Sequence, residues 1–384
     1  MFDRRSLLIG GGAAAVAAAF APRMAFAKAA TDRRFVFIIQ RGAADGLSMV
    51  APVGDPAFSG VRGVLGEDLA GARKLDAMFA LHPALVQTGA LYGKGQALFA
   101  HAIASPYRDR SHFDGQNVLE TGGVRAYQQK DGWLNRLLGV VPTEERSAIA
   151  VAATVPMALR GSREVASYAP SALPDASEDL LRRVTMLYEG DKQLHALWDE
   201  ALQTRTLTGD LAGDNGRNAA ATGALAAKLL LPANGARIAM IETGGWDTHS
   251  AQKGRLQAQL KGLDAMIAAL QAGLGPVWDR TMVLVATEFG RTVAVNGTNG
   301  TDHGTASAAM LLGGAVKGGR VIADWPGLAP AALYEGRDLK PTMGLDAFIG
   351  GAVAGHFALD PAPTMAALFP ASAKARATEG LVRA

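Results

Sequence analysis

Short runs of consecutive apolar residues recur along the chain, and longer stretches with helical spacing lie between them. Runs this short, without polar alternation, are typical of strands buried on both faces. Residues 251–272 and 345–359 carry apolar side chains at the three- and four-residue spacing of helices. The alternation predicts an α/β domain, a doubly wound, mainly parallel sheet sandwiched by helices. The predicted strands are 34–39, 97–103, 148–153, 238–241, 282–286 and 308–312.

The pattern changes between residues 177 and 231, where apolar residues recur at helical spacing in a charged background. We therefore expect an amphipathic helical insertion within one domain that spans residues 28–384. A glycine-containing stretch at 209–216 is its expected internal loop. The apolar positions are Leu180, Leu181, Val184, Leu187, Leu194, Leu197 and Trp198.

The first 27 residues have the organisation of an export signal. The pair Arg4-Arg5 precedes an uncharged run from Leu7 to Ala21, and Ala25-Phe26-Ala27 has the small residues of a cleavage site. This resembles a twin-arginine signal, which implies the twin-arginine export machinery as a partner. The run is shorter than the roughly 20 residues of a membrane span, so we expect no stable membrane anchor. The prediction is a periplasmic mature protein cut near Ala27, with an uncleaved anchor or an amphipathic helix as the alternatives.

Charge and cysteine content exclude several functions. The whole chain has 38 Lys and Arg against 35 Asp and Glu; residues 1–27 contain three of the former and one of the latter, which leaves 35 against 34. A balance this close to zero gives no reason to expect nucleic acid as a partner. The chain has no cysteine, which excludes disulfides, thiolate metal sites and thiol nucleophiles.

Carboxylate and imidazole side chains lie next to three of the predicted strands. Asp247 and His249 follow the strand 238–241, Glu288 follows the strand 282–286, and Asp302-His303 precede the last strand. Open α/β sheets build their sites at strand ends. Carboxylates and imidazoles together are ligands of hard or borderline metal ions. We therefore predict a divalent metal site, with zinc, calcium, magnesium and manganese all open.

The chain resembles the alkaline-phosphatase-like superfamily, which includes sulfatases and phosphoglycerate mutases. Within it, the chain looks like a branch of twin-arginine-exported, sulfatase-like proteins known by a domain of unknown function. The resemblance covers most of the mature chain and implies an alkaline-phosphatase-like fold. The motifs that carry it are Gln40-Arg-Gly-Ala-Ala-Asp45-Gly-Leu, Leu81-His-Pro-Ala-Leu, Ser111-His112-Phe-Asp, Glu120-Thr-Gly, Gly244-Gly-Trp-Asp247-Thr-His249, Thr287-Glu288-Phe-Gly-Arg291-Thr and Asp302-His303-Gly.

The resemblance implies metal roles for six residues. Asp45 resembles the first metal-binding Asp of the superfamily, and Asp247 with His249 resembles its Asp-then-His pair. Asp302-His303 resembles the second metal pair, or His303 alone resembles the late third His, which is the alignment we favour. Glu288-Phe289 then stands where the superfamily has Asp-His, so one ligand nitrogen is lost. A single metal, an altered metal and lost catalysis all remain open.

The same resemblance points to a nucleophile and to residues that bind the substrate. Ser111 lies one position from the place of the superfamily's nucleophile, at the start of a helix; an N-cap role is equally open. His112, Arg108 and Arg110 are expected to bind the substrate, and Arg291 is expected to act in catalysis, because guanidinium groups match phosphate and sulfate oxygens.

Together these features predict a periplasmic, metal-dependent hydrolase of small phosphate or sulfate esters. The alternative is a non-catalytic periplasmic binding or assembly protein that retains the fold. A nicotinamide or flavin enzyme is less favoured, because no Gly-x-Gly-x-x-Gly follows a strand of the mature chain.

Overall fold

The computed structural model describes residues 32–67, 69–142, 147–169, 178–188, 191, 194–195, 198–199, 218–232 and 235–383. The expected signal peptide, residues 1–27, and the expected loop at 209–216 lie outside these residues. Within the described ranges, no helix combines the length and the apolarity needed to cross a membrane.

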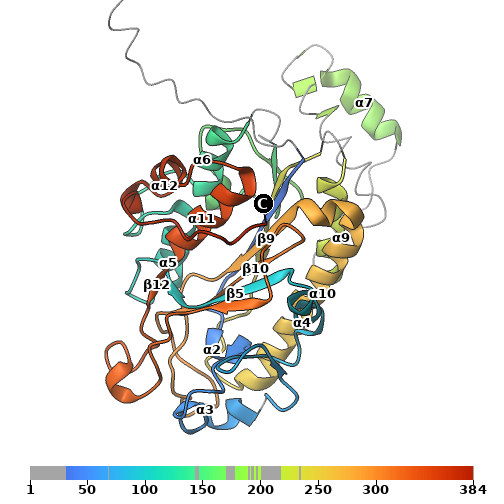
Figure 1. The fold of residues 1–384 in the computed structure, drawn as a ribbon. Helices are drawn as coiled ribbons and strands as arrows, with labels where there is room; N and C mark the ends of the chain where they lie inside the picture. Colours follow the sequence, from blue (N-terminus) through green and yellow to red (C-terminus); the bar gives the residue numbers. More distant parts are fainter. Residues whose placement is uncertain are drawn as a thin grey trace, which may run out of the picture.

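A central nine-stranded sheet is the frame of the molecule (Figure 1). All six predicted runs are strands of this sheet. Its order is β11-β5-β10-β9-β1-β8-β6-β7, with β12 paired to β5, and only β10 runs antiparallel to both of its neighbours. The mainly parallel sheet of the prediction is therefore confirmed. The strands are β1 (Arg34–Gln40), β5 (Ala97–Ala104), β6 (Ala148–Val151), β7 (Ala166–Ser167), β8 (Ile238–Thr243), β9 (Thr281–Ala286), β10 (Ser307–Leu312), β11 (Arg320–Ile322) and β12 (Met343–Gly344).

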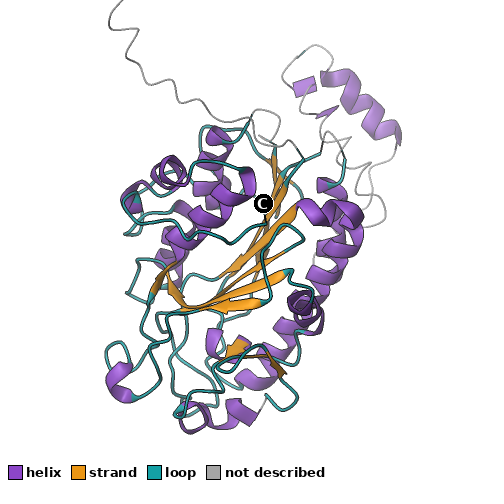
Figure 2. Ribbon diagram, viewed as in Figure 1, coloured by secondary structure: helices purple, strands orange, loops and turns teal. Residues whose placement is uncertain are grey.

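Helices cover both faces of the sheet (Figure 2). Side chains of β1 alternate between the two layers: Val36 and Ile38 enter one hydrophobic core, whereas Phe35 and Phe37 enter the other. The first layer contains α4 (Val86–Gly93), α9 (Ala219–Leu230) and α10 (Gln252–Leu274); the second contains α5 (His112–Thr121), α6 (Trp133–Val140), α11 (Leu345–Phe357) and α12 (Pro361–Leu368).

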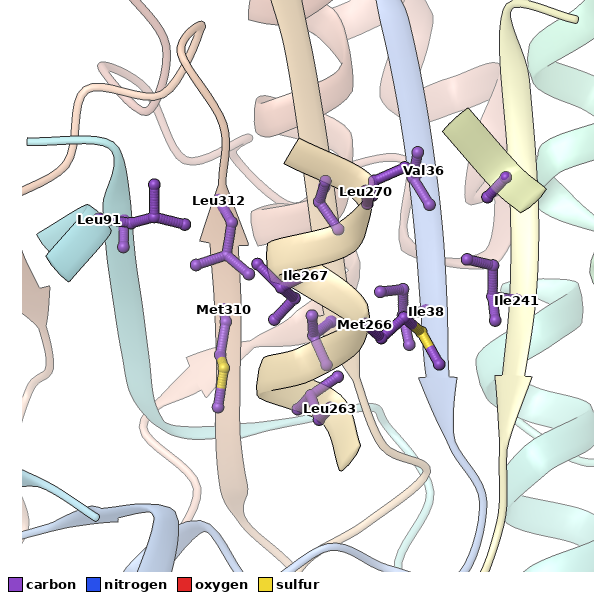
Figure 3. Close-up of a cluster of buried hydrophobic side chains, with 14 of the residues drawn as sticks. Val36, Ile38, Leu91, Ile241, Leu263, Met266, Ile267, Leu270, Met310 and Leu312 are labelled. Carbon is purple, nitrogen blue, oxygen red and sulfur yellow. The ribbon is translucent and has the colours of Figure 1, made fainter. Parts of the chain in front are cut away.

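The longest helix, α10, shows how this packing is encoded. Leu256, Leu260, Leu263, Ile267 and Leu270 recur every three or four residues and are all buried. Figure 3 shows the part of this stripe from Leu263 to Leu270 lying over β1 and β10. Each such side chain contributes about 1.5–3 kcal/mol when fully buried.

Smaller elements lie at the carboxyl edge of the sheet and beyond its opposite end. Helices α2 (Gly46–Met49) and α3 (Phe58–Glu67) follow β1, near a small sheet of β2 (Val50–Ala51), β4 (Ala80–Leu81) and β3 (Arg73–Lys74). Helix α7 (Glu178–Tyr188) lies at the other end of the molecule (Figure 1). Short 3-10 helices are η2 (Met157–Leu159), η4 (Gly275–Arg280), η5 (Pro330–Ala332) and η6 (Pro370–Ser372).

The range expected to form a helical insertion divides into two parts. Helix α7 lies within it, but α9 packs on the sheet, with Leu225, Leu229 and Leu230 in the first core. Helix α9 therefore belongs to the main helical layer, because its apolar face has the sheet and α10 as partners.

Candidate metal centre

The candidate site lies at the carboxyl edge of the sheet, where several chain segments meet. Asp247 and His249 follow β8, Glu288 follows β9, and His112 is the first residue of α5. His303 precedes β10, and it reaches the same edge because β10 is antiparallel to β9, which places its amino end beside the carboxyl end of β9.

Imidazole nitrogens converge on the carboxylate of Asp247. Its Oδ1 lies 3.0 Å from His249 Nε2 and 3.3 Å from His303 Nε2, and its Oδ2 lies 3.4 Å from His112 Nε2. Ligand atoms of His112, Asp247 and His303 all lie within 4.8 Å of one another. Asp247 and His249 keep side-chain exposures of 40% and 45%, so solvent and small molecules can reach this cluster.

The other ring nitrogen of each imidazole faces an oxygen acceptor. Nδ1 of His112 lies 2.8 Å from Glu288 Oε1, and Nδ1 of His249 lies 3.0 Å from Asp302 Oδ1. Nδ1 of His303 lies 2.9 Å from the backbone oxygen of Arg110. A carboxylate or carbonyl oxygen only accepts, so each Nδ1 carries a proton, and a ring with no second proton offers its Nε2 lone pair to the cluster. Metal-binding histidines are oriented by this arrangement.

The geometry between the Nε2 atoms fits a shared cation. His249 Nε2 and His303 Nε2 lie 3.0 Å apart, and among the described residues His112 Nε2 is buried without a hydrogen-bond partner. Two lone pairs at this distance require a proton or a metal ion between them. Bonds of about 2.0–2.1 Å in a tetrahedron place ligand atoms about 3.3 Å apart, close to the separations around Asp247 Oδ1.

The charges of the cluster also favour a cation. Asp247, Glu288 and Asp302 contribute three negative charges and Arg291 one positive charge, which leaves −2 with neutral imidazoles. The hydrogen bond that His112 donates to Glu288 raises the pKa of His112, although burial opposes the shift. Burial, together with the nearby charge of His112, lowers the pKa of His303, so its lone pair is available at neutral pH.

Arg291 contacts the cluster from its buried side. Its Nη1 lies 2.5 Å from Asp247 Oδ1, its Nε donates to Thr301 Oγ1 at 3.1 Å, and it also donates to the Thr301 carbonyl. Burial alone would raise the pKa of Asp247, but the hydrogen bond and charge of Arg291 outweigh it, and the pKa is lowered. Asp247 is therefore a carboxylate at neutral pH.

Asp45, expected as a metal ligand, has its carboxylate bound by donors of the protein. It is buried and caps α2, with Oδ1 accepting from the Leu47 backbone and Oδ2 accepting from Ser48, Arg62 and Gln252. Burial would raise its pKa, but Arg62 and these donors lower it. Both oxygens are thus engaged, and the positive charge beside Asp45 is a guanidinium.

Glu288 and Asp302 reach the cluster but face the outer nitrogens of the imidazoles. Glu288 is fully buried and also accepts from the Gly42 backbone at 2.8 Å and from Gln116 at 3.1 Å. Asp302 also accepts from Asn296 at 3.1 Å. Both carboxylates thus bind the Nδ1 side of a histidine, whereas His112, expected to bind substrate, lies within metal-binding distance of Asp247 and His303. Its place at a helix start was visible in the sequence, but its distance from Asp247 was not.

The residues expected to bind or attack the substrate have varied surroundings. Arg110 pairs with Asp338 and Glu335, and Arg108 donates to the backbone oxygens of Ser105 and Tyr107. Both guanidinium groups are thus engaged within the protein. Ser111 is the N-cap residue of α5, but its side chain makes no capping hydrogen bond.

Comparison with known families gives one match. A family model described as "Protein of unknown function (DUF1501)" matches residues 32–349, which is 318 of 384 residues. None of the curated proteins compared with the chain matches it.

Proposed function

The chain belongs to the DUF1501 family, and from its site we propose a periplasmic, metal-dependent hydrolase of phosphate or sulfate esters. The observation that carries the proposal is the convergence of three Nε2 atoms on Asp247, each ring oriented through its Nδ1 by an oxygen acceptor. The resemblance to the alkaline-phosphatase-like superfamily and the mainly parallel sheet agree with this proposal.

Three nitrogens and one carboxylate indicate which ion fits best. Imidazole is a common ligand of zinc and other transition metals, whereas calcium and magnesium prefer oxygen ligands. Of the divalent ions that the sequence left open, zinc therefore suits these donors better than calcium, magnesium and manganese. Bound there, such an ion would polarise the ester oxygen and offset charge on the transferred group.

Residues of the chain would ionise and orient the ligands and bind the ester. Arg291 keeps Asp247 ionised, and Glu288 holds the ring of His112 in its orientation. The first turn of α5 begins beside the cluster, and its backbone N–H groups can bind an anionic ester oxygen. Ser111 lies at this helix start, and in this proposal its hydroxyl is the nucleophile.

A second candidate is a non-catalytic binding protein, and one observation favours it. Phe289, which stands where the resemblance expects a histidine, is buried and stacks on His112 with ring centroids 5.1 Å apart. It also contacts the ring of His303 at 5.4 Å. An aromatic ring at this place supplies no ligand for a second ion, so the cluster would have the ligands of a single ion, which agrees with a function in binding alone.

Metal analysis and an ester panel separate these functions. Asp247→Asn combined with His249→Ala should remove a stoichiometric divalent metal and abolish hydrolysis of aryl phosphates or sulfates, with the fold retained because both residues lie on a loop. The control is His195→Ala, because His195 lies in a helix that is remote in sequence from the cluster. A wild-type protein that hydrolyses no ester on the panel would favour the binding function, and absence of bound metal would contradict the metal-dependent hydrolase.

The proposed location has its own test. Substituting Arg4 and Arg5 together by lysine should leave the precursor in the cytoplasm, because the twin-arginine machinery reads this pair. Cell fractionation measures the result, and an unchanged periplasmic yield would contradict the proposed export route.

A further inference from the structure

The side chain of Gln252 occupies the point where the two loops that carry site residues meet. It is fully buried at the first residue of α10. Its Oε1 accepts from Thr248 Oγ1 at 3.0 Å and from Thr301 Oγ1 at 2.6 Å. Its Nε2 donates to the carboxylate of Asp45. One amide thus binds three polar side chains in the interior.

The two threonines are neighbours of the candidate ligands. Thr248 stands between Asp247 and His249, and Thr301 precedes Asp302 and His303. The backbone N–H of Thr301 also donates to the carbonyl of Thr248 at 3.2 Å. These contacts join the two chain segments whose imidazoles have their Nε2 atoms 3.0 Å apart.

The ion pair of Asp45 and Arg62 fixes the direction of the amide. Both side chains are 1% exposed, and Arg62 also donates to Ser48 Oγ at 2.7 Å and to the carbonyls of Thr292 and Val293. Because an ionised carboxylate only accepts, the NH₂ group of Gln252 must face Asp45 and its carbonyl must face the threonines.

Arg291 continues the same network to the cluster. It donates to Thr301 Oγ1, and Thr301 in turn donates to Gln252. Each hydroxyl and amide therefore has one consistent hydrogen-bond role between Asp45 and Asp247. A buried network whose members are all satisfied is rigid and tolerates little rearrangement.

We propose that Gln252 is a positioning residue that holds the Asp247–His249 and Asp302–His303 segments at the separation required by one metal ion. This inference rests on the proposed metal site. It gives the Asp45–Arg62 pair a role as the fixed anchor of the amide, in place of the ligand role that the sequence implied for Asp45. Residues that orient metal ligands in this way typically change metal affinity 10–100-fold when substituted.

Zinc affinity, measured by competition with a chromophoric chelator, tests the proposal on the full mature protein. Gln252→Met has similar length and no hydrogen bonds, and we expect zinc to bind 10–100-fold more weakly. Thr301→Val should have the same direction of effect, whereas Thr301→Ser, which keeps the hydroxyl, should retain the affinity. In the double variant of Gln252→Met and Thr301→Val, the losses should not add, because both remove one shared interaction.

Thr88→Val is the matched control for a purely structural role. Thr88 is fully buried and its hydroxyl donates to Asp264 at 2.8 Å, on a different part of α10. This variant should lose stability while its zinc affinity stays within twofold of wild type. Should Gln252→Met fail to fold, Thr301→Val carries the test.

The outcomes distinguish this inference from the proposed function. Failure of the wild-type protein to bind zinc overturns the metal site itself. Tight wild-type binding that is unchanged in both Gln252→Met and Thr301→Val overturns only the positioning role.

Discussion

The histidines at the edge of the sheet use their nitrogens differently from those in its interior. His101 is fully buried and accepts from the Ala102 backbone at Nδ1, 2.7 Å away, while its Nε2 donates to the Gly46 carbonyl at 3.2 Å. His356 is also buried and donates from Nε2 to the Arg34 carbonyl at 2.8 Å. At the edge, the rings of His112, His249 and His303 use Nδ1 for an acceptor and direct Nε2 toward Asp247.

The interior histidines and the candidate ligand histidines differ in where their lone pairs point. Burial lowers the pKa of His101 to about 4, and burial together with the charge of Arg33 lowers that of His356 to about 3. Both therefore stay neutral and bind the backbone. In the edge cluster the Nε2 atoms of all three imidazoles face the carboxylate of Asp247. Their direction, more than the number of histidines in the chain, identifies the site.

The largest expected effect comes from removing one edge imidazole. His112→Ala should weaken zinc binding by more than about 100-fold, because a direct ligand contributes more than the residues that orient it. Equilibrium competition with a chelator measures the affinity. His356→Gln is the interior counterpart and should bind zinc as wild type does. Equal losses in the two variants would remove the distinction between edge and interior.

The interior histidines should make stability depend on pH. The native pKa of His356 lies below that of the unfolded chain, so its stabilisation is fully present above pH 6.5 and is lost as pH falls toward about 3. The slope is about 1.4 kcal/mol per pH unit for one group. Urea unfolding between pH 4 and 6 should therefore show a shallower pH dependence for His356→Gln than for wild type. Parallel curves would show that His356 does not remain neutral.

A smaller effect is expected at the carboxylate that orients His112. Glu288→Gln should weaken zinc binding about 10–100-fold. The amide oxygen accepts a weaker hydrogen bond from His112 than the carboxylate does, and the amide NH₂ group can face the imidazole N–H with no acceptor between them. Glu120→Gln is a matched buried control, since Glu120 accepts from Ala158 and pairs with Arg41. If the two variants bind zinc equally well, Glu288 has only a structural role and does not orient His112 for zinc binding.

The smallest effect on stability is expected at Ser111. Ser111→Ala should cost less than about 1 kcal/mol, because the side chain makes no capping bond, and metal should be retained. Thermal unfolding and metal analysis check both points. Under the proposed function the same variant loses ester hydrolysis by orders of magnitude; unchanged hydrolysis would exclude Ser111 as the nucleophile.

The sequence predicts the sheet and the chain segments of the site, but only part of the site's geometry. Apolar runs locate β1, β8 and β9, so the polar residues after them could be placed at one edge. A run of apolar residues does not indicate whether its strand lies parallel or antiparallel to its neighbours, so the reversal of β10 could not be predicted. The pairing of Asp45 with Arg62, 17 residues away, depends on how α3 packs, which no local pattern specifies. The place of His112 beside Asp247 likewise depends on an irregular connection after β5.

The reversed strand β10 also has a consequence for the order of folding. Val285 pairs with Met310, which is only 25 residues further along the chain. Strands β9 and β10 therefore form a local unit that fixes both ends of the loop between them. Asp247 joins this unit only when β8 pairs with β1, for example Ile238 with Phe35, across about 200 residues of chain. Contacts between distant residues form slowly, because a long loop must close first. We therefore expect the residues before β10 to reach their arrangement earlier than the complete cluster, which also needs β8 to pair with β1.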